Sequence, residues 1–452
     1  VDDSVVRVMG DRPVLLRRAR GYAPLPIIIS STKVGFGFAQ PMLTEQSQII
    51  QDFNYQKSPQ NILALGGHLK NAIAFSIRQE GQPQGDYPYP ITNSTFCRDS
   101  LPVPALDINS IIISQHIGDL QTTKAFEHFQ RIINQLSEAY EFHPEAIACD
   151  AHPDYISSQY AQQLSQSLQI PLIPVQHHYA HVLAGMADNQ LQPPVLGIAW
   201  DGTGYGTDGT IWGGEFLKVT DSGFERVAHL RRFKLLGGDK AAKEPRRSAL
   251  GILWEMFGDR LWNMDLEPLQ AFTNSELAIL KTLLTKQLAT PQTSSMGRLF
   301  DAVASLLNIC QIASFEGQAA IALESLCDRA NTFDFYNKFN LRFNVKNNVE
   351  IDWSPLIQAI LEDMRNKVDV ETITAKFHNS LVEAIALVAK QIGIEQIVLT
   401  GGCFQNRYLT ERAMQKLQQS RFQPYCHHQI PPNDGGIATG QIMAVLREHL
   451  SP

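Results

Sequence analysis

The sequence lacks a long apolar run, a dense block of basic residues and a closely spaced cysteine pair. About 20 consecutive apolar residues are needed to cross a bilayer, and the first ten residues lack the features of a signal peptide. The net charge of −7, without any run of five Lys or Arg, argues against binding to a nucleic-acid backbone or a membrane surface. The six cysteines include no C-x-x-C motif, which argues against a thiolate zinc site and a disulfide framework. We therefore expect a cytoplasmic protein whose partners are small molecules or proteins.

The length and the hydrophobic pattern predict an α/β protein with two lobes. A chain of 452 residues with 44% hydrophobic residues exceeds what one core ordinarily holds. Short apolar runs alternate with longer segments of helical spacing, which is typical of α/β folds. Strands are predicted at residues 62–65, 111–114, 147–149 and 195–200, and helices at 123–140, 155–167 and 370–392.

Two segments depart from this alternation. Residues 4–8 and 13–17 predict a strand pair, and a basic, Gly- and Pro-containing linker follows before Ile27. Since the chain starts without Met, we expect residues 1–26 to be the end of a preceding domain. Residues 79–109 contain five prolines and little periodicity, and we expect a surface insertion there.

Glycines follow several of the predicted strands. A strand, a glycine turn and a second strand are predicted at residues 62–77 and again at 195–219, which suggests duplicated lobes facing a cleft. A further strand ends in Gly401-Gly402. Glycine at such strand ends lets backbone N–H groups approach an anion closely.

Residues 201–206 superficially match a dinucleotide-binding fingerprint, D-G-T-G-Y-G. That fingerprint opens a helix, whereas residues 209–216 open a strand, so we exclude a Rossmann site. Two interpretations stay open: a phosphate-binding hairpin in which Asp201 contacts a metal or water, or a simple type I′ hairpin.

His177 and His181 lie four residues apart in a predicted helix. They would project from one face and could bind one metal ion, although such a pair can also be structural or surface-exposed. The glutamate of the zinc-protease motif is absent, which disfavours peptide hydrolysis. Asp434, on a Gly-rich turn, could complete the site. Two imidazoles and a carboxylate suit zinc or ferrous iron and leave positions open for substrate oxygens.

Three further segments have both a ligand-binding and a structural interpretation. The glycine-led loop at residues 237–247 brings cations, including Lys243 and Arg247, to a helix start, where an anion is favoured. Residues 293–301 and 315–320 predict either capped helix starts or nucleotide-contacting loops.

Taken together, these segments resemble the family of hydrogenase maturation carbamoyltransferases called HypF. The matching segments cover essentially the whole chain: residues 65–71, 114–120, 152–155, 177–181, 201–216, 237–247, 294–302, 315–320, 401–406 and 431–441. The resemblance implies a two-lobed actin-like ATPase fold with a nucleotide and metal cleft between the lobes. By the same resemblance, residues 1–26 are the end of a YrdC-like domain. Residues 27–190 form the first lobe with the insertion at 79–109, residues 191–425 form the second lobe, and residues 426–452 return towards the first.

The resemblance also implies a reaction. In the family, a carbamoyl group from carbamoyl phosphate passes with ATP through carbamoyl adenylate to the C-terminal cysteine of HypE, where it later becomes the cyanide ligand of nickel–iron hydrogenase. The acylphosphatase-like and zinc-finger domains of the family and most of its YrdC-like domain are absent from this sequence. We therefore expect this chain to need carbamoyl adenylate made elsewhere.

Carried over by position, the metal ligands are His177, His181 and Asp434, with Asp201 close by. The metal is zinc or iron, and magnesium is a further candidate cofactor. Lys243 and Arg247 are candidates for contacting phosphate and carbamoyl oxygens, and His177, His181 and Asp201 complete the catalytic set. The predicted nucleotide-binding residues are Gly66, Gly67, Gly202, Gly204, Gly297, Asp301, Glu316, Gly401, Gly402 and Asn406.

Two rival functions stay open. Related domains carbamoylate other acceptors, such as tRNA or small molecules, although the absence of a basic stripe counts against tRNA. Alternatively, the chain is a fragment that binds nucleotide or HypE without turnover. Consumption of carbamoyl adenylate would separate the two, because a binding fragment does not consume it.

Overall fold

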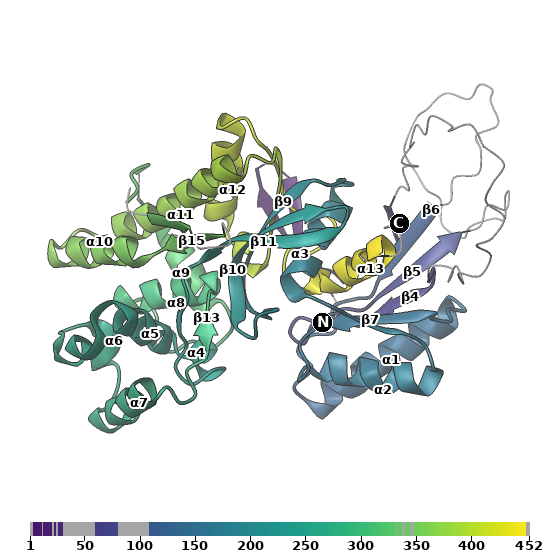
Figure 1. Ribbon diagram of the computed structural model, residues 1–452, viewed down its shortest axis with the longest axis horizontal. Coiled ribbons are helices and arrows are strands. Elements are labelled where there is room, and N and C mark those ends of the chain that lie inside the picture. Colours follow the sequence, from purple (N-terminus) through teal and green to yellow (C-terminus); the bar gives the residue numbers. More distant parts are fainter. Residues whose placement is uncertain are drawn as a thin grey trace, which may run out of the picture.

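The computed structural model describes residues 3–10, 12–19, 22–23, 26–29, 59–79, 108–330, 332–336, 340–343 and 348–448. Within these ranges it shows two large β-sheets, each with its own helices, and a separate two-stranded hairpin (Figure 1). The predicted insertion at 79–109 lies outside the described residues apart from its two ends. None of the described helices is long and apolar enough to span a bilayer.

The first sheet has six described strands, in the order β3-β6-β5-β4-β7-β8. These strands are β3 (Pro26–Ile29), β4 (Ile62–Ala64), β5 (Ala74–Gln79), β6 (Ile108–Ile113), β7 (Ala146–Asp150) and β8 (Leu172–Val175). Helices α1 (Thr123–Ala139) and α2 (Ile156–Leu168) cover its outer face, where Phe75 and Phe129 belong to one buried cluster. β7 and β8 are parallel, and Asp150 lies opposite Val175. This register brings the end of β7 beside the residues that begin the next helix.

The second sheet has nine described strands and contains the largest core. Its main path is β14-β15-β11-β10-β9-β16-β17, and two short strands, β12 and β13, lie off this path. The strands are β9 (Val195–Tyr205), β10 (Ile211–Thr220), β11 (Gly223–Leu230), β12 (Phe233–Lys234), β13 (Gln292–Thr293), β14 (Asn340–Phe343), β15 (Val349–Asp352), β16 (Gln396–Thr400) and β17 (Gln423–Tyr425). Residues Val195–Trp200 of β9 are buried without interruption, as expected of a central strand covered on both faces.

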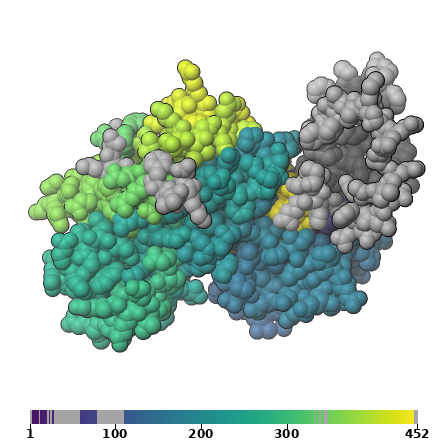
Figure 2. Space-filling view, viewed as in Figure 1, coloured from purple at the N-terminus to yellow at the C-terminus, as the bar shows by residue number. Residues whose placement is uncertain are grey.

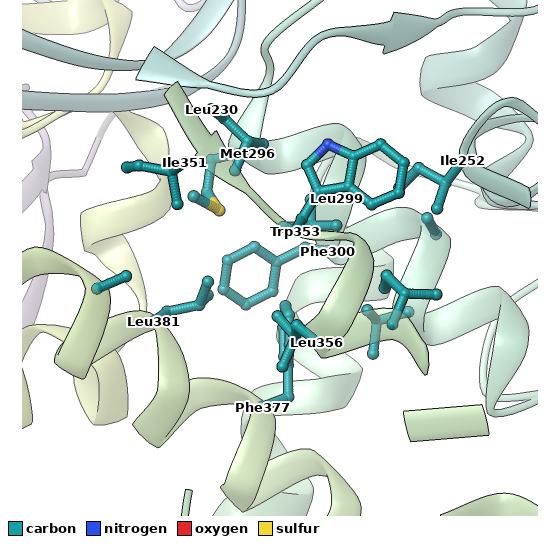
Figure 3. Close-up of a cluster of buried hydrophobic side chains, with 14 of the residues drawn as sticks. Leu230, Ile252, Met296, Leu299, Phe300, Ile351, Trp353, Leu356, Phe377 and Leu381 are labelled. Carbon is teal, nitrogen blue, oxygen red and sulfur yellow. The ribbon is translucent and has the colours of Figure 1, made fainter. Parts of the chain in front are cut away.

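Helices pack on the outer face of this second sheet around aromatic side chains. Phe300, Trp353 and Phe377 meet in this core, with Leu299 and Leu356 beside them (Figure 3). The helices after β12 are α4 (Lys240–Lys243), α5 (Pro245–Phe257), α6 (Glu267–Gln270), α7 (Asn274–Lys286), α8 (Met296–Leu306), α9 (Gln318–Cys327), α10 (Ser354–Arg365), α11 (Val370–Ile392) and α12 (Arg407–Gln419), with the 3-10 helices η1 (Gly258–Asn263) and η2 (Gly402–Gln405).

Two helices form the layer between the sheets. α3 (His177–Asp188) and α13 (Ile437–Glu448) cross closely, because Gly440 lies against the Ala180 carbonyl, where a Cβ would come within 1.8 Å of the oxygen. The short 3-10 helix η3 (Asp434–Gly436) leads into α13. Ala184 and Ile442 pack against the first sheet, whereas Val182 and Ala444 belong to the cluster against the second. This architecture confirms the predicted two-lobed α/β fold, and Figure 2 shows a notch between the two parts.

The N-terminal hairpin joins the two parts. β1 (Val5–Met9) pairs with β2 (Arg12–Arg17) as the sequence predicts. The Arg7 guanidinium donates to Glu324 and to the Gln405 carbonyl of the second part, while the Arg18 carbonyl accepts from the His116 amide of the first. The hairpin therefore contacts both parts of the molecule.

One local prediction is wrong. The sequence indicated a turn at residues 201–206, but β9 continues to Tyr205 and the turn to β10 follows it. Glycines 202 and 204 are therefore strand residues. At Gly204 a Cβ would come within 2.4 Å of the His178 ring and 2.7 Å of the His177 ring, so the glycine makes room for α3 rather than for a turn.

Candidate functional site

Four side chains from three elements converge between the two parts of the molecule. His177 and His181 come from the first turns of α3, Asp201 from β9, and Asp434 from η3. One ligand atom from each lies within 4.8 Å of all the others. Both imidazoles are fully buried, and the Asp201 and Asp434 side chains are only 12% and 13% exposed. We call these four residues the His-Asp cluster.

The spacing within the His-Asp cluster fits a metal ion better than direct hydrogen bonds. The His177 Nε2 atom lies 3.5 Å from Asp201 Oδ2 and 3.8 Å from Asp434 Oδ1. The corresponding distances from His181 Nε2 are 3.6 and 3.5 Å. Tetrahedral ligands at metal bonds of 2.0–2.2 Å are separated by about 3.4 Å. The four distances between imidazole nitrogens and carboxylate oxygens are therefore close to the separation that one shared ion imposes.

The unsatisfied polar atoms support the same interpretation. Within the described part of the chain, neither His177 Nε2 nor His181 Nε2 has a hydrogen-bond partner, although both are buried. Buried polar atoms are rarely left unpaired unless a ligand or water completes them. Two imidazoles and two carboxylates form a donor set that zinc and ferrous iron both accept, so the residues present fit a divalent metal.

Asp150 orients one of the imidazoles. Its Oδ2 atom lies 2.7 Å from His177 Nδ1, and both side chains are fully buried. The carboxylate accepts a hydrogen bond from the Nδ1–H group. This tautomer leaves the lone pair on Nε2, which points into the His-Asp cluster. Asp150 was not among the predicted site residues. A signal existed, since Asp150 ends a buried strand whose parallel neighbour ends two residues before His177.

The local backbone explains how α3 presents its histidines. Gln176 caps the helix, because its side-chain oxygen accepts from the Tyr179 amide at 2.7 Å, and its amide donates to the Tyr205 carbonyl at the end of β9. Helix α3 is thus tied at its first turn to the strand that carries Asp201. His177 and His181, one turn apart, consequently face β9.

The carboxylates make the cluster strongly attractive to cations. Burial opposes a charge on His177, but Asp150 and Asp201 raise its pKa well above the ordinary value. Burial also opposes ionisation of Asp201, yet the two imidazoles of His177 and His181 beside it lower its pKa well below the usual range. A metal ion would therefore replace protons on binding, and its affinity would rise with pH.

Several of the predicted nucleotide-binding residues border the His-Asp cluster. The Gly402 amide donates to Asp201 Oδ1 at 3.0 Å, and a Cβ on Gly67 would lie 3.5 Å from Asp434 Oδ2. Gly297 begins α8 against Gly202, where a Cβ would come within 2.9 Å of the Gly202 Cα. Gly401 has φ +94° and packs against the Trp200 carbonyl. Glycine at these positions allows three chain segments to meet beside the cluster.

Other predicted residues have different surroundings. The Gly66 amide and carbonyl both pair with the Gln441 side chain and so anchor α13. Asn406 caps α12 through the Leu409 amide, and its side-chain nitrogen contacts His378 Nε2 at 3.0 Å. Both polar atoms of the Asn406 side chain thus have a partner within the protein. Its role as a nucleotide ligand stays a prediction.

Asp301 and Glu316 lie on the second part of the molecule. Burial raises the pKa of Asp301 to about 6, against the opposing effect of Arg298, whose Nε is 3.0 Å from the Asp301 carboxylate. Glu316 contributes to the same upward shift and pairs with Lys70 of the first part at 2.7 Å. Lys70 was also missing from the predicted site residues.

The two predicted basic residues have different surroundings. Arg247 Nε lies 2.9 Å from the Glu244 carboxylate and its side chain is only 12% exposed, whereas Lys243 is exposed on α4. In the described part of the chain, neither has a hydrogen bond or ion pair with the His-Asp cluster. Contact of these side chains with substrate oxygens stays a prediction.

Comparison with known proteins identifies the family. Residues 197–441, more than half of the chain, match the family model described as "Carbamoyltransferase, Kae1-like Domain, second subdomain", and residues 103–188 match "HypF Kae1-like domain". The chain belongs to the HypF carbamoyltransferase family. The resemblance inferred from the sequence motifs is therefore confirmed.

Relatives of known name agree along the chain. It is 40% identical to carbamoyltransferase HypF of Synechocystis sp. over 99% of its own length and 52% of that protein. It is 34% identical to a HypF homolog of Cupriavidus necator, over 73% of this chain and 85% of that protein. The chain thus spans about half the length of most of the curated HypF relatives it matches.

Two solved HypF structures share the fold. A full-length HypF, described as phosphate- and nucleotide-bound, superposes with a TM-score of 0.79 at 34% identity, covering 100% of this chain and 51% of that one. HypF of T. kodakarensis superposes with a TM-score of 0.75 at 27% identity, over 98% of this chain and 52% of that one. Both matches place the fold described above within the family.

Proposed function

We propose that this chain transfers the carbamoyl group of carbamoyl adenylate to the C-terminal cysteine of HypE during hydrogenase maturation, in the cytoplasm. The observation that carries the proposal is the His-Asp cluster between the two parts of a HypF-family chain, four side chains of metal-ligand type whose imidazole Nε2 atoms have no hydrogen-bond partner among the described residues. The nucleotide bound to a solved HypF relative supports an adenylate as substrate.

The proposed transfer exchanges one acyl bond for another. The cysteine sulfur bonds to the carbamoyl carbon, the bond from that carbon to the phosphate oxygen breaks, and AMP leaves with the electron pair while the thiol proton passes to solvent. A divalent ion, zinc or iron, held by His177, His181, Asp201 and Asp434 would supply Lewis-acid polarisation of the carbonyl oxygen.

The chain's own residues would prepare the site for this chemistry. Asp150 would keep the proton of His177 on Nδ1 by accepting a hydrogen bond from it, and the Nε2 atom would then be free to bind the ion. The Gly402 amide holds Asp201, and the glycines at 67, 202, 297 and 401 would let backbone amides approach the adenylate phosphate. Preorganised donors of this kind stabilise developing negative charge without reorganisation at the moment of reaction.

The proposal is tested by incubating the purified chain with carbamoyl adenylate, with and without HypE. AMP release and the mass of HypE are followed together. We expect HypE-dependent AMP release and one added carbamoyl group per HypE. A His177→Ala/His181→Ala variant should lose both the metal, measured by elemental analysis, and the transfer.

The rival functions give different results in the same experiment. A fragment that only binds would retain carbamoyl adenylate without consuming it. A transferase for another acceptor would leave HypE unmodified but release AMP when that acceptor is added. Either result would overturn the assignment to HypE.

A further inference from the structure

An ion pair links the two parts of the molecule beside the His-Asp cluster. Lys70 Nζ, from the loop between β4 and β5, lies 2.7 Å from Glu316 Oε1, in the loop before α9. The two side chains are 30% and 48% exposed. Such partly exposed pairs contribute little to stability, so the contact is easily exchanged for another partner.

Hydrogen bonds hold the loop that carries Lys70. Lys70 adopts a left-handed backbone conformation with φ +46°, which is rare for a residue with a side chain. Its amide donates to the Asp119 carboxylate at 2.9 Å, and the neighbouring Asn71 side chain donates to the carbonyls of Leu65 and Gly67. An unfavourable conformation that the surroundings enforce is found often at ligand sites.

The acidic side chains around Lys70 favour the charge on its ammonium. Burial opposes its charge, but Glu316, Asp434 and Asp201 together raise the pKa of Lys70 above its ordinary value. The neighbouring Gly67 borders Asp434. Lys70 therefore provides a cation on a loop that borders the His-Asp cluster, and that cation is paired with a predicted nucleotide-binding residue, Glu316.

We propose that Lys70 binds the phosphate of the adenylate, and that Glu316 occupies Lys70 until the nucleotide displaces it. This inference rests on the proposed function. A phosphate oxygen forms a charge-assisted hydrogen bond with an ammonium and replaces the carboxylate directly. Because Lys70 and Glu316 belong to different parts of the molecule, the exchange also releases a contact between them.

The test compares AMP with adenosine, which lacks only the phosphate. Binding of both to the full chain is measured by calorimetry for wild type, Lys70→Met, Glu316→Gln and, as a matched control, Lys124→Met on the exposed side of α1. We expect Lys70→Met to weaken AMP binding at least ~10-fold and leave adenosine binding unchanged. Glu316→Gln should increase the preference for AMP over adenosine, and Lys124→Met should change neither.

Several results would overturn the inference. It fails if Lys70→Met leaves the ratio of AMP to adenosine affinity unchanged, or if the wild-type chain binds no AMP. Should Lys70→Met not fold, Lys70→Arg retains the charge and must retain the AMP preference, while Lys70→Gln must lose it. If wild type transfers carbamoyl to HypE while the ratio does not depend on Lys70, only this inference fails. If the ratio depends on Lys70 but no transfer occurs, only the proposed function fails.

Discussion

At the scale of single residues, the second nitrogen of each histidine distinguishes the two imidazoles of the His-Asp cluster. His177 has its Nδ1 fixed by the buried Asp150 carboxylate. His181 Nδ1 has no hydrogen-bond partner within the described residues. His177 is thus oriented by a hydrogen bond, whereas packing alone within α3 orients His181. Metal binding by His177 should therefore depend on the Asp150 carboxylate, whereas metal binding by His181 should not depend on a hydrogen-bonded neighbour.

Replacing Asp150 tests this dependence. In Asp150→Asn the side chain can present an N–H to His177 Nδ1, which favours the other tautomer and directs a proton into the cluster. We expect metal affinity to fall by about 10- to 100-fold, as is typical when such a carboxylate is lost. A competition titration with a metal indicator measures the change.

Asp154→Asn provides the control, because Asp154 is an exposed residue of the same loop. It should bind metal as tightly as wild type. Equal affinities for the wild type and both variants would show that Asp150 has no part in metal binding.

At the scale of secondary-structure elements, β9 positions the site through its glycines. Gly202 and Gly204 lie two residues apart in β9, at a point where its pairing with β10 is irregular. Their surroundings differ: a Cβ at 204 would strike the His177 and His178 rings, whereas at 202 the nearest atom is the Arg298 Nη2 atom, at 3.8 Å. Of these two glycines, Gly204 is the one that α3 requires, and Gly197 of the same strand is required in the same way, because its Cβ would come within 2.2 Å of Val182.

The pair Gly204→Ala and Gly202→Ala makes this difference measurable. The methyl group at 204 must displace a buried helix, and overpacking of this kind costs about 1–3 kcal/mol. We expect Gly204→Ala to lower the free energy of unfolding by that amount and to weaken metal binding. Gly202→Ala should retain the wild-type unfolding midpoint in urea. A stable Gly204→Ala variant with normal metal affinity would contradict this account of the strand.

The same glycines show where sequence reasoning reached its limit. Apolar runs predicted the strands at 62–65 and 195–200, and hydrophobic periodicity predicted the helix at 370–392. These predictions succeeded because the pattern that identifies each element lies within the element's own sequence. D-G-T-G-Y-G was predicted as a turn, since its composition is that of a turn. Gly204 is there because α3 packs over it, and no local pattern records that contact. Asp150 and Lys70 were missed for the same reason: their partners are distant in sequence.

At the scale of the whole molecule, the His-Asp cluster draws on elements that belong to different layers. Asp201 extends from the second sheet, the histidines from α3 between the sheets, and Asp434 from the loop that leads into α13. α13 in turn packs on the first sheet through Ile442 and Val445. An ion bound by all four side chains would join these layers at one point.

Metal binding should therefore stabilise the folded chain. A ligand that binds only the native state, at a free concentration about 100 times its dissociation constant, adds about 2.7 kcal/mol to the free energy of unfolding. Urea denaturation with zinc or ferrous iron should show this gain over the chelated protein. The Asp434 side chain is 13% exposed. In Asp434→Ala the metal should add much less to the free energy of unfolding, because one of the ligands that join the layers is lost. An equal gain in wild type and Asp434→Ala would mean that the stabilising ion binds elsewhere, and the His-Asp cluster would then not be the metal site.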